Sequence, residues 1–208
     1  MKILAVADTE DKFIWDYFDK EKFKDVELII SCGDLKANYL EFLVTMIPAP
    51  LLYVHGNHDE IYYKEPPEGC IDIDGKVYIH DNGIRILGLG GSMRYRPDRQ
   101  DQYTESEMEK RIGKLRRIIK KTGGIDIFVA HSPAYKIGDG EDTAHTGFKC
   151  FINLVLNCYR PKYFLHGHQH ASYNRRMKRK HKYLNTEIIN VGPYYLFDYK
   201  VQPQAEEE

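Results

Sequence analysis

The chain has 208 residues, 42% hydrophobic and 29% charged, which is ordinary for a globular protein and argues against extensive disorder. Thirty Lys and Arg against thirty-one Asp and Glu leave a net charge of -1, so nothing in the overall charge favours nucleic acid or an anionic membrane as a partner. The four cysteines form no Cys-x-x-Cys pair, which predicts neither a structural zinc site nor a disulfide framework. We expect one cytoplasmic domain over residues 1–200, without a membrane span, and a disordered acidic tail over residues 201–208.

Short apolar runs predict buried strands, because their apolar residues are continuous rather than alternating. They lie at residues 3–7, 28–31, 51–54, 84–89, 125–130, 163–165 and 187–191. Helical patterns fall within residues 11–23 and 146–158, and the clearest helix begins at Thr104, where Glu107 completes a capping box, and ends at Gly123. Alternating strands and helices predict an α/β layered fold.

Polar side chains follow five of the predicted strands, at the points where the strands end. The first strand is followed by Asp8, the second by Asp34, the third by "HGNHD" with Asn57, His58 and Asp59, a later one by His131, and the last of the five by "HGHQH" with His168 and His170. Each residue alone has an ordinary explanation, such as a helix cap, a turn or a buried histidine. Together they predict a shared crevice, because the carboxyl ends of strands in an open α/β sheet converge.

Imidazole and carboxylate ligands without thiolate suit manganese, iron or zinc, and their number exceeds what one ion needs. We therefore expect two divalent ions, most simply manganese or iron with zinc as the alternative, sharing a bridging carboxylate. Gly56 and Gly167 precede key residues of this group and predict a close approach of the backbone to the site.

These motifs, in this order, resemble those of the calcineurin-like metallophosphoesterase superfamily, which run D-x-H, G-D, G-N-H-[DE], H and G-H-x-H. The resemblance spans residues 8–170. It implies a four-layer sandwich of two mixed sheets flanked by helices, with a dinuclear metal site at the strand ends. It also implies that one metal is held by Asp8, Asp34 and His170, that Asp34 bridges, and that the other is held by Asn57, His131 and His168.

The sequence departs from the family pattern at Glu10, which stands where the pattern has His. A carboxylate is a competent ligand for manganese or iron, so the simplest interpretation is that Glu10 ligates the first metal. The alternative is that Glu10 points away and the first metal is bound weakly or through water.

Two ions at such a site can generate a bridging hydroxide and clamp the phosphoryl oxygens, which predicts hydrolysis of a phosphodiester or phosphomonoester. His58 is the candidate general acid, with Asp59 orienting its ring. Substrate contacts are predicted for Asn57, His58, His145 and Arg94, the last within an arginine-containing loop that equally fits a solvated surface.

The predicted partner is a small phosphorylated molecule such as a nucleotide. The sequence does not fix the oligomeric state, and a homo-oligomer stays open. Two alternatives stay open. One is a metal-binding regulatory protein in which Glu10 has weakened the first site. The other is a nuclease that uses the basic run at residues 175–182, which otherwise fits a charged hairpin tip.

Overall fold

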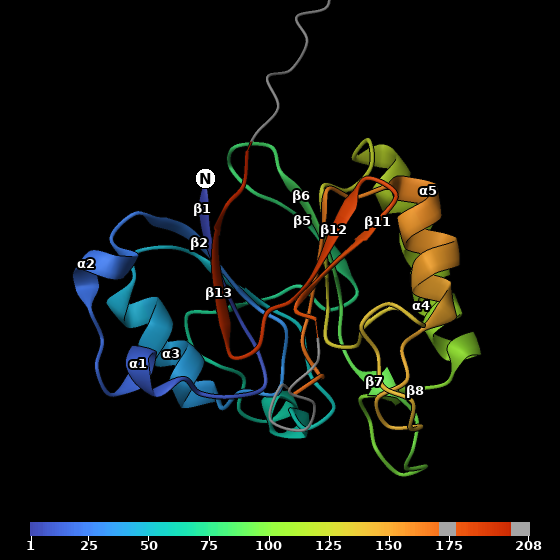
Figure 1. Ribbon diagram of the computed structural model, residues 1–208, viewed down its shortest axis with the longest axis horizontal. Helices are drawn as coiled ribbons and strands as arrows, with labels where there is room; N and C mark the ends of the chain where they lie inside the picture. Colours follow the sequence, from blue (N-terminus) through green and yellow to red (C-terminus); the bar gives the residue numbers. More distant parts are fainter. Residues whose placement is uncertain (171–177, 201–208) are drawn as a thin grey trace, which may run out of the picture.

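Two β-sheets pack face to face between two layers of helices in the computed structural model, which describes residues 1–170 and 178–200 (Figure 1). The first sheet has the strand order β13 (Tyr194–Asp198), β1 (Lys2–Val6), β2 (Val26–Ser31), β3 (Leu51–Tyr53), β4 (Ile71–Asp72). The second sheet has the order β11 (Lys180–Tyr183), β12 (Thr186–Asn190), β10 (Tyr163–His166), β9 (Ile127–Ala130), β6 (Arg85–Leu89), β5 (Lys76–Ile79). This four-layer arrangement confirms the fold class predicted from the sequence.

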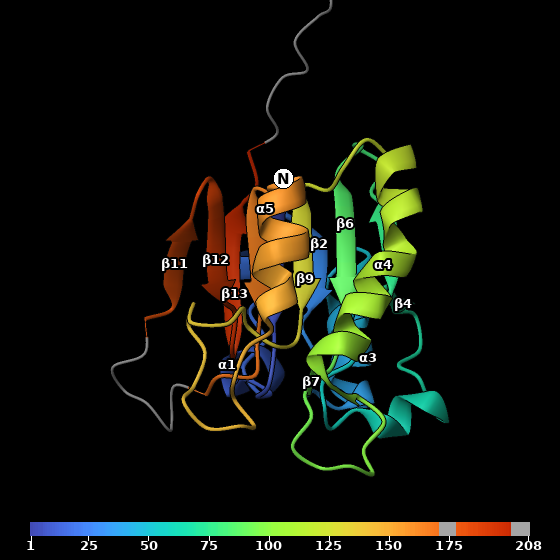
Figure 2. The same cartoon turned by 90° about the vertical axis from the view of Figure 1, so that its right-hand side faces the viewer.

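The continuous apolar runs are explained by burial on both faces of each sheet. Ile3, Ala5 and Ala7 pack between the two sheets, whereas the alternate residues Leu4 and Val6 pack under the helices of the first layer. That layer comprises α1 (Lys12–Trp15), α2 (Lys20–Phe23) and α3 (Ala37–Met46). The outer face of the second sheet is covered by α4 (Glu105–Lys121) and by the helical segment that joins the π-helix η2 (Phe151–Leu156) to α5 (Asn157–Tyr159) (Figure 2).

Within each sheet the central strands are parallel. β1 pairs in parallel with β2, β2 with β3, β6 with β9, and β9 with β10, while the edge strands β13, β5 and β11 are antiparallel to their neighbours. A small separate ladder joins β7 (Ser92–Met93) to β8 (Gln102–Tyr103), and the 3-10 helix η1 (Glu60–Tyr63) follows β3. The carboxyl ends of β1, β2, β3, β9 and β10 therefore face one edge of the molecule, the lower edge in Figure 1.

Helix α4 confirms the prediction from its capping signals. The Thr104 side chain accepts from the backbone N–H of Glu107, and the Glu107 carboxylate accepts from the N–H of Thr104. Among the described residues, no helix has the length and apolar character that crossing a bilayer requires.

Three sequence-based expectations need correction. The single helix predicted within residues 11–23 is two four-residue helices, because Asp11 and Asp19 each cap a separate one. Helix α3 was not predicted, since its N-cap, Lys36, makes no side-chain capping bond. The described part of the basic run, residues 178–182, is not a hairpin tip: residues 180–182 lie on β11 and the turn falls at residues 184–185. Residues 175–177 of that run and the predicted tail at 201–208 lie outside the described residues.

Candidate metal centre

Ligand-type side chains from both sheets meet at the edge where the parallel strands end. Asp8 follows β1, Asp34 follows β2 and Asn57 follows β3, whereas His131 follows β9 and His168 follows β10. Asp8, Asp34 and His168 have positive φ angles of 67°, 56° and 67°. Non-glycine residues adopt this left-handed conformation rarely, and such strain concentrates at functional sites.

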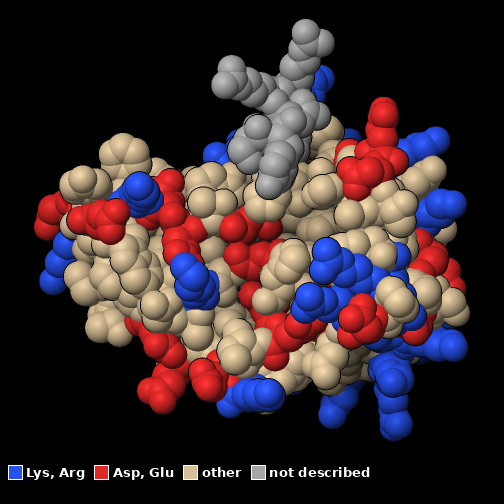
Figure 3. All heavy atoms as spheres, turned by 90° about the horizontal axis from the view of Figure 1, so that it is seen from below, with Lys and Arg blue, Asp and Glu red and all other residues tan. Residues whose placement is uncertain are grey.

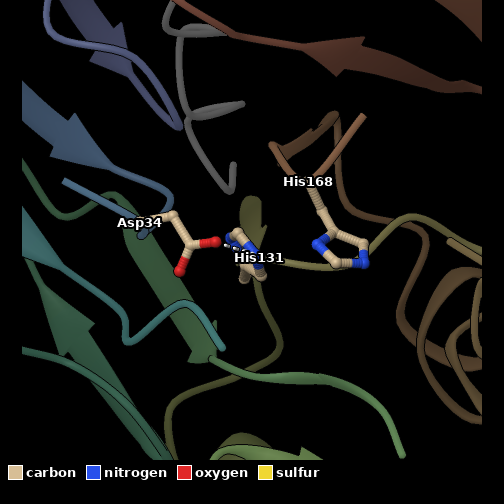
Figure 4. Close-up of side chains that lie close together, drawn as sticks. All are labelled: Asp34, His131 and His168. Atoms are coloured by element: carbon tan, nitrogen blue, oxygen red, sulfur yellow. Dashed lines mark ion pairs between the residues drawn. The ribbon is translucent and has the colours of Figure 1, made fainter. Parts of the chain in front are cut away.

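Asp34, His131 and His168 form the centre of the cluster (Figure 4). One ligand atom from each lies within 4.8 Å of the others, and the Nε2 atom of His131 is 3.4 Å from Oδ2 of Asp34. The same Nε2 atom lies 3.0 Å from Oδ1 of Asn57. The group therefore places two imidazoles, a carboxylate and an amide oxygen around one point.

Backbone carbonyls orient both imidazoles. The Nδ1 atom of His131 is 2.8 Å from the carbonyl of Cys32, and the Nε2 atom of His168 is 2.7 Å from the carbonyl of Ala144. A carbonyl accepts only from a protonated nitrogen, so these contacts fix Nδ1 of His131 and Nε2 of His168 as N–H donors. Metal-binding histidines characteristically donate their second N–H in this way.

Asp8 and Glu10 line a pocket of about 460 Å³ together with Asp34 and His58. The Asp8 carboxylate accepts from the backbone N–H of His168, at 2.8 Å and 3.0 Å for its two oxygens. The Glu10 carboxylate instead pairs with the ammonium of Lys36 at 3.2 Å. Glu10 thus lies in the predicted first-metal pocket, but in this structure a lysine neutralises it.

Acidic side chains gather at the centre of this face (Figure 3). Burial raises the pKa of Asp8, whereas the positive charges of His131 and His170 lower it. His170, the last residue before the undescribed segment, is half-buried and close enough to act on the charge of Asp8. The burial of Asp34 is outweighed by the charge and hydrogen bonds of His131, which hold the pKa of Asp34 well below its usual range.

The two central histidines have opposite shifts. Burial opposes protonation of His131, but the charge of Asp34 outweighs it and raises the pKa of His131 to about 9. Burial, together with the charge of His131, lowers the pKa of His168 to about 3. Asp34 therefore lies beside a positive charge on His131, the place that a bound divalent cation would take. The cluster's oxygen and imidazole donors and their carbonyl partners fit such an ion.

Gly56 and Gly167 must be glycines because a side chain there would collide with a neighbouring carboxylate, not because a turn demands their backbone conformation. A Cβ on Gly56 would collide with the Asp34 carboxylate, and a Cβ on Gly167 would lie 2.7 Å from Oδ2 of Asp8. The predicted close approach of the backbone at these two positions is confirmed.

Asp59 has partners different from the one predicted. Its carboxylate is buried and accepts from the backbone N–H groups of Asp34, at 2.8 Å, and Gly56, at 2.6 Å, and no hydrogen bond between it and the His58 ring is found. Asp59 therefore ties together the two loops that carry Asp34 and Asn57. Burial and the charge of Asp34 raise the pKa of Asp59 to about 7.

His58 is held by its backbone and not by its ring. Its N–H donates to Oδ1 of Asp34 at 2.8 Å, its side chain is exposed, and no other described residue hydrogen-bonds the imidazole. The ring is free to reach a molecule in the pocket.

The predicted substrate contacts occupy different places. His145 lies beside the cluster, its ring centroid 5.3 Å from that of His168, and its Nδ1 atom is 2.8 Å from Asp142. The guanidinium of Arg94 binds the carbonyl of Gln102 and pairs with Glu107 at 2.9 Å, which directs it toward the start of α4.

Sequence reasoning missed one side chain at the site. The hydroxyl of Tyr95 lies 3.2 Å from Nδ2 of Asn57 and so holds the amide with its oxygen toward His131. The only signal was its position, since Tyr95 stands beside Arg94 in the loop after a strand.

Comparison with known proteins decides the family. A family model described as calcineurin-like phosphoesterase matches residues 1–172. The chain belongs to the calcineurin-like phosphoesterase family. It is similar to the uncharacterized protein MJ1162 of Methanocaldococcus jannaschii, with 27% identity covering 96% of this chain and 93% of the relative.

Solved structures support the same fold. One superposes with a TM-score of 0.69 and 14% identity, covering 95% of this chain and 94% of the other. TT1561 of Thermus thermophilus superposes with a TM-score of 0.63 and 14% identity, covering 92% of this chain and 88% of the other. At these identities the likeness concerns the fold.

Proposed function

We propose that this protein is a metal-dependent phosphoesterase that hydrolyses a phosphodiester. The observation that carries the proposal is the convergence of Asp34, His131 and His168 within 4.8 Å at the edge shared by both sheets. Asn57 and Asp8 adjoin this cluster. Asp8, Asp34, Asn57, His131, His168 and His170 are the residues that would hold two divalent ions, with Glu10 as a further ligand. When bound, the ions supply Lewis acidity and a water of lowered pKa.

The chain's own residues supply positioning and proton transfer. Asp59 fixes the two ligand loops relative to each other through two backbone hydrogen bonds. Tyr95 fixes the Asn57 amide. His58, whose ring is exposed and free, donates a proton to the leaving oxygen of the ester.

Metal content and turnover test the proposal together. Protein purified without chelator should hold about two divalent ions per chain, and hydrolysis of bis-p-nitrophenyl phosphate should require manganese or iron. His131→Ala should remove both metal binding and turnover, whereas His58→Gln should keep the metals and lower kcat by about 100-fold or more. His80→Gln, a half-buried histidine at the turn after β5 that does not line the metal pocket, is the matched control. Full metal occupancy without turnover on mono- or diesters would rule out the proposal.

A metal-binding regulatory protein is the second candidate, and the ion pair between Glu10 and Lys36 favours it, because a neutralised Glu10 weakens the first site. The contacts of Arg179 count against the nuclease alternative. Its guanidinium donates to the backbone carbonyls of Asn190 and Val191, so this residue of the basic run is occupied within the fold.

A further inference from the structure

A second groove lies beside the metal pocket, on the other side of His58. It has a volume of about 600 Å³ and runs between η1 and the loop at residues 98–100. His58 and Ile61 line both the groove and the pocket of Asp8 and Asp34. A molecule whose phosphoryl group lies at the metal centre therefore has room to extend past His58 into this groove.

The Tyr63 side chain is an exposed aromatic ring that is already fixed. It is 54% exposed, yet its hydroxyl donates to Oδ1 of Asp101 at 2.6 Å, and Asp101 is fully buried. Its ring centroid lies 4.8 Å from that of the buried His55. Immobilising a mobile side chain lowers binding affinity, and the Tyr63 ring is already immobilised by its hydrogen bond to Asp101 before any ligand binds. Beside it, Ile61 is 51% exposed and extends the apolar wall.

The charges around the groove are balanced. Arg99 pairs with Glu60 at 2.6 Å, and the remaining charged residues in the lining, Lys64 and Asp98, have opposite signs. A site for a polynucleotide or a polyphosphate needs an excess of cations. The groove instead sets Tyr63 and Ile61 among polar side chains whose charges cancel, a lining that offers an uncharged ring both a stacking face and hydrogen-bond partners.

We propose that this groove binds the leaving group of the substrate, and that this leaving group is a flat, uncharged ring system of nucleoside size. The inference rests on the proposed function and makes the substrate a phosphodiester of a nucleoside. In the reaction, a water oxygen forms a bond to phosphorus, the phosphorus–oxygen bond to the nucleoside breaks, and the nucleoside oxygen takes a proton from His58. Of the two protons of the water, one stays on the oxygen now bound to phosphorus and the other goes to solvent, from which His58 takes a proton again.

Adenosine, an uncharged nucleoside, is the probe. Its binding is measured calorimetrically on the full chain in the presence of chelator, so that the groove is tested without the metals. Tyr63→Ala should weaken binding about tenfold, as expected for loss of a stacking ring, whereas Tyr63→Phe keeps the ring and should change it by less than about threefold. Tyr17→Ala is the matched control, because Tyr17 is 73% exposed and lines neither the groove nor the metal pocket.

Tyr63→Ala also removes a partner of buried Asp101, so Ile61→Ala provides a second variant that leaves that bond in place. It should weaken adenosine binding about threefold. With manganese present, adenosine should inhibit hydrolysis of bis-p-nitrophenyl phosphate competitively. Wild-type protein that fails to bind millimolar adenosine, or Tyr63→Ala and Ile61→Ala that both bind it as wild type does, would overturn the inference. Adenosine binding lost in both variants, in a protein without turnover, would support the nucleoside groove and refute only the proposed catalysis.

Discussion

Replacing Lys36 by Gln should strengthen binding of the first metal ion. The Lys36 ammonium lies 3.2 Å from Oε2 of Glu10, so an ion that uses Glu10 as a ligand must displace the lysine. The Lys36 side chain is 74% exposed and that of Glu10 is 31% exposed. A pair this exposed contributes about 0.2–1 kcal/mol, so its removal should raise the affinity of the first metal by roughly 1.5- to fivefold.

Calorimetric titration of manganese into chelator-treated protein, at low ionic strength, measures this change. The difference between Lys36→Gln and wild type should shrink in about 1 M salt, because salt screens exposed charges. Lys24→Gln is the matched control, since Lys24 forms a similarly exposed pair with Glu21 at 2.9 Å away from the site. Glu10→Gln should weaken the same binding step. If Lys36→Gln binds manganese no more tightly than wild type, Glu10 is not a ligand and the reasoning fails.

Three further predictions, two of them with a paired control substitution, test the site and the fold. Gly56→Ala should displace the Asp34 carboxylate and weaken manganese binding at least about tenfold. Gly113 on α4 has open space around it, so Gly113→Ala should instead raise the free energy of unfolding, measured in urea, by about 0.5–1 kcal/mol. Manganese binding by Gly56→Ala at the wild-type level would contradict the close contact. Asp126 pairs with the Arg85 guanidinium at 2.7 Å, and this partner lowers the pKa of Asp126 despite burial. The stabilisation from this pair is therefore present above the ordinary pKa of 3.8 and lost as pH falls through the lower folded pKa. Asp126→Asn should therefore cost about 1–2 kcal/mol at neutral pH and less near pH ~2, and an equal cost at both would count against the ion pair. Arg179→Gln should lower the free energy of unfolding by about 1–3 kcal/mol and Lys180→Gln by under about 0.5, since only the former binds buried carbonyls; equal losses would refute this distinction.

The parts of the fold that follow local rules were predictable. The buried strands were recognised from continuous apolar runs, and α4 from the capping pair Thr104 and Glu107. Helix α3 begins at Lys36 without a capping side chain, so no local signal marks its start. Strand β13 lies at a sheet edge and is paired with β1, nearly the whole chain away, which a local pattern does not reveal.

In the candidate site, too, some features follow from the sequence and others depend on tertiary contacts. The order of ligand types along the chain indicated which residues meet, and the structure brings Asp34, Asn57, His131 and His168 together. What holds them was not predictable, because the partners are backbone carbonyls and a tyrosine from distant loops. Asp59 illustrates the limit: its neighbour in sequence suggested one partner, and tertiary structure supplied two others.

The candidate ligands come from both sheets, and this has a consequence for the stability of the whole sandwich. Asp34 and Asn57 belong to the first sheet, whereas His131 and His168 belong to the second. An ion held by all four would cross-link the two sheets. It could bind only when the sheets are in their native relative position. If the proposed ion is bound, unfolding must release it, so metal at about 100 times its dissociation constant would add about 2.7 kcal/mol to the free energy of unfolding. Chelator should accordingly lower the melting temperature of the entire domain, including α3 and α4, which lie in the outer layers.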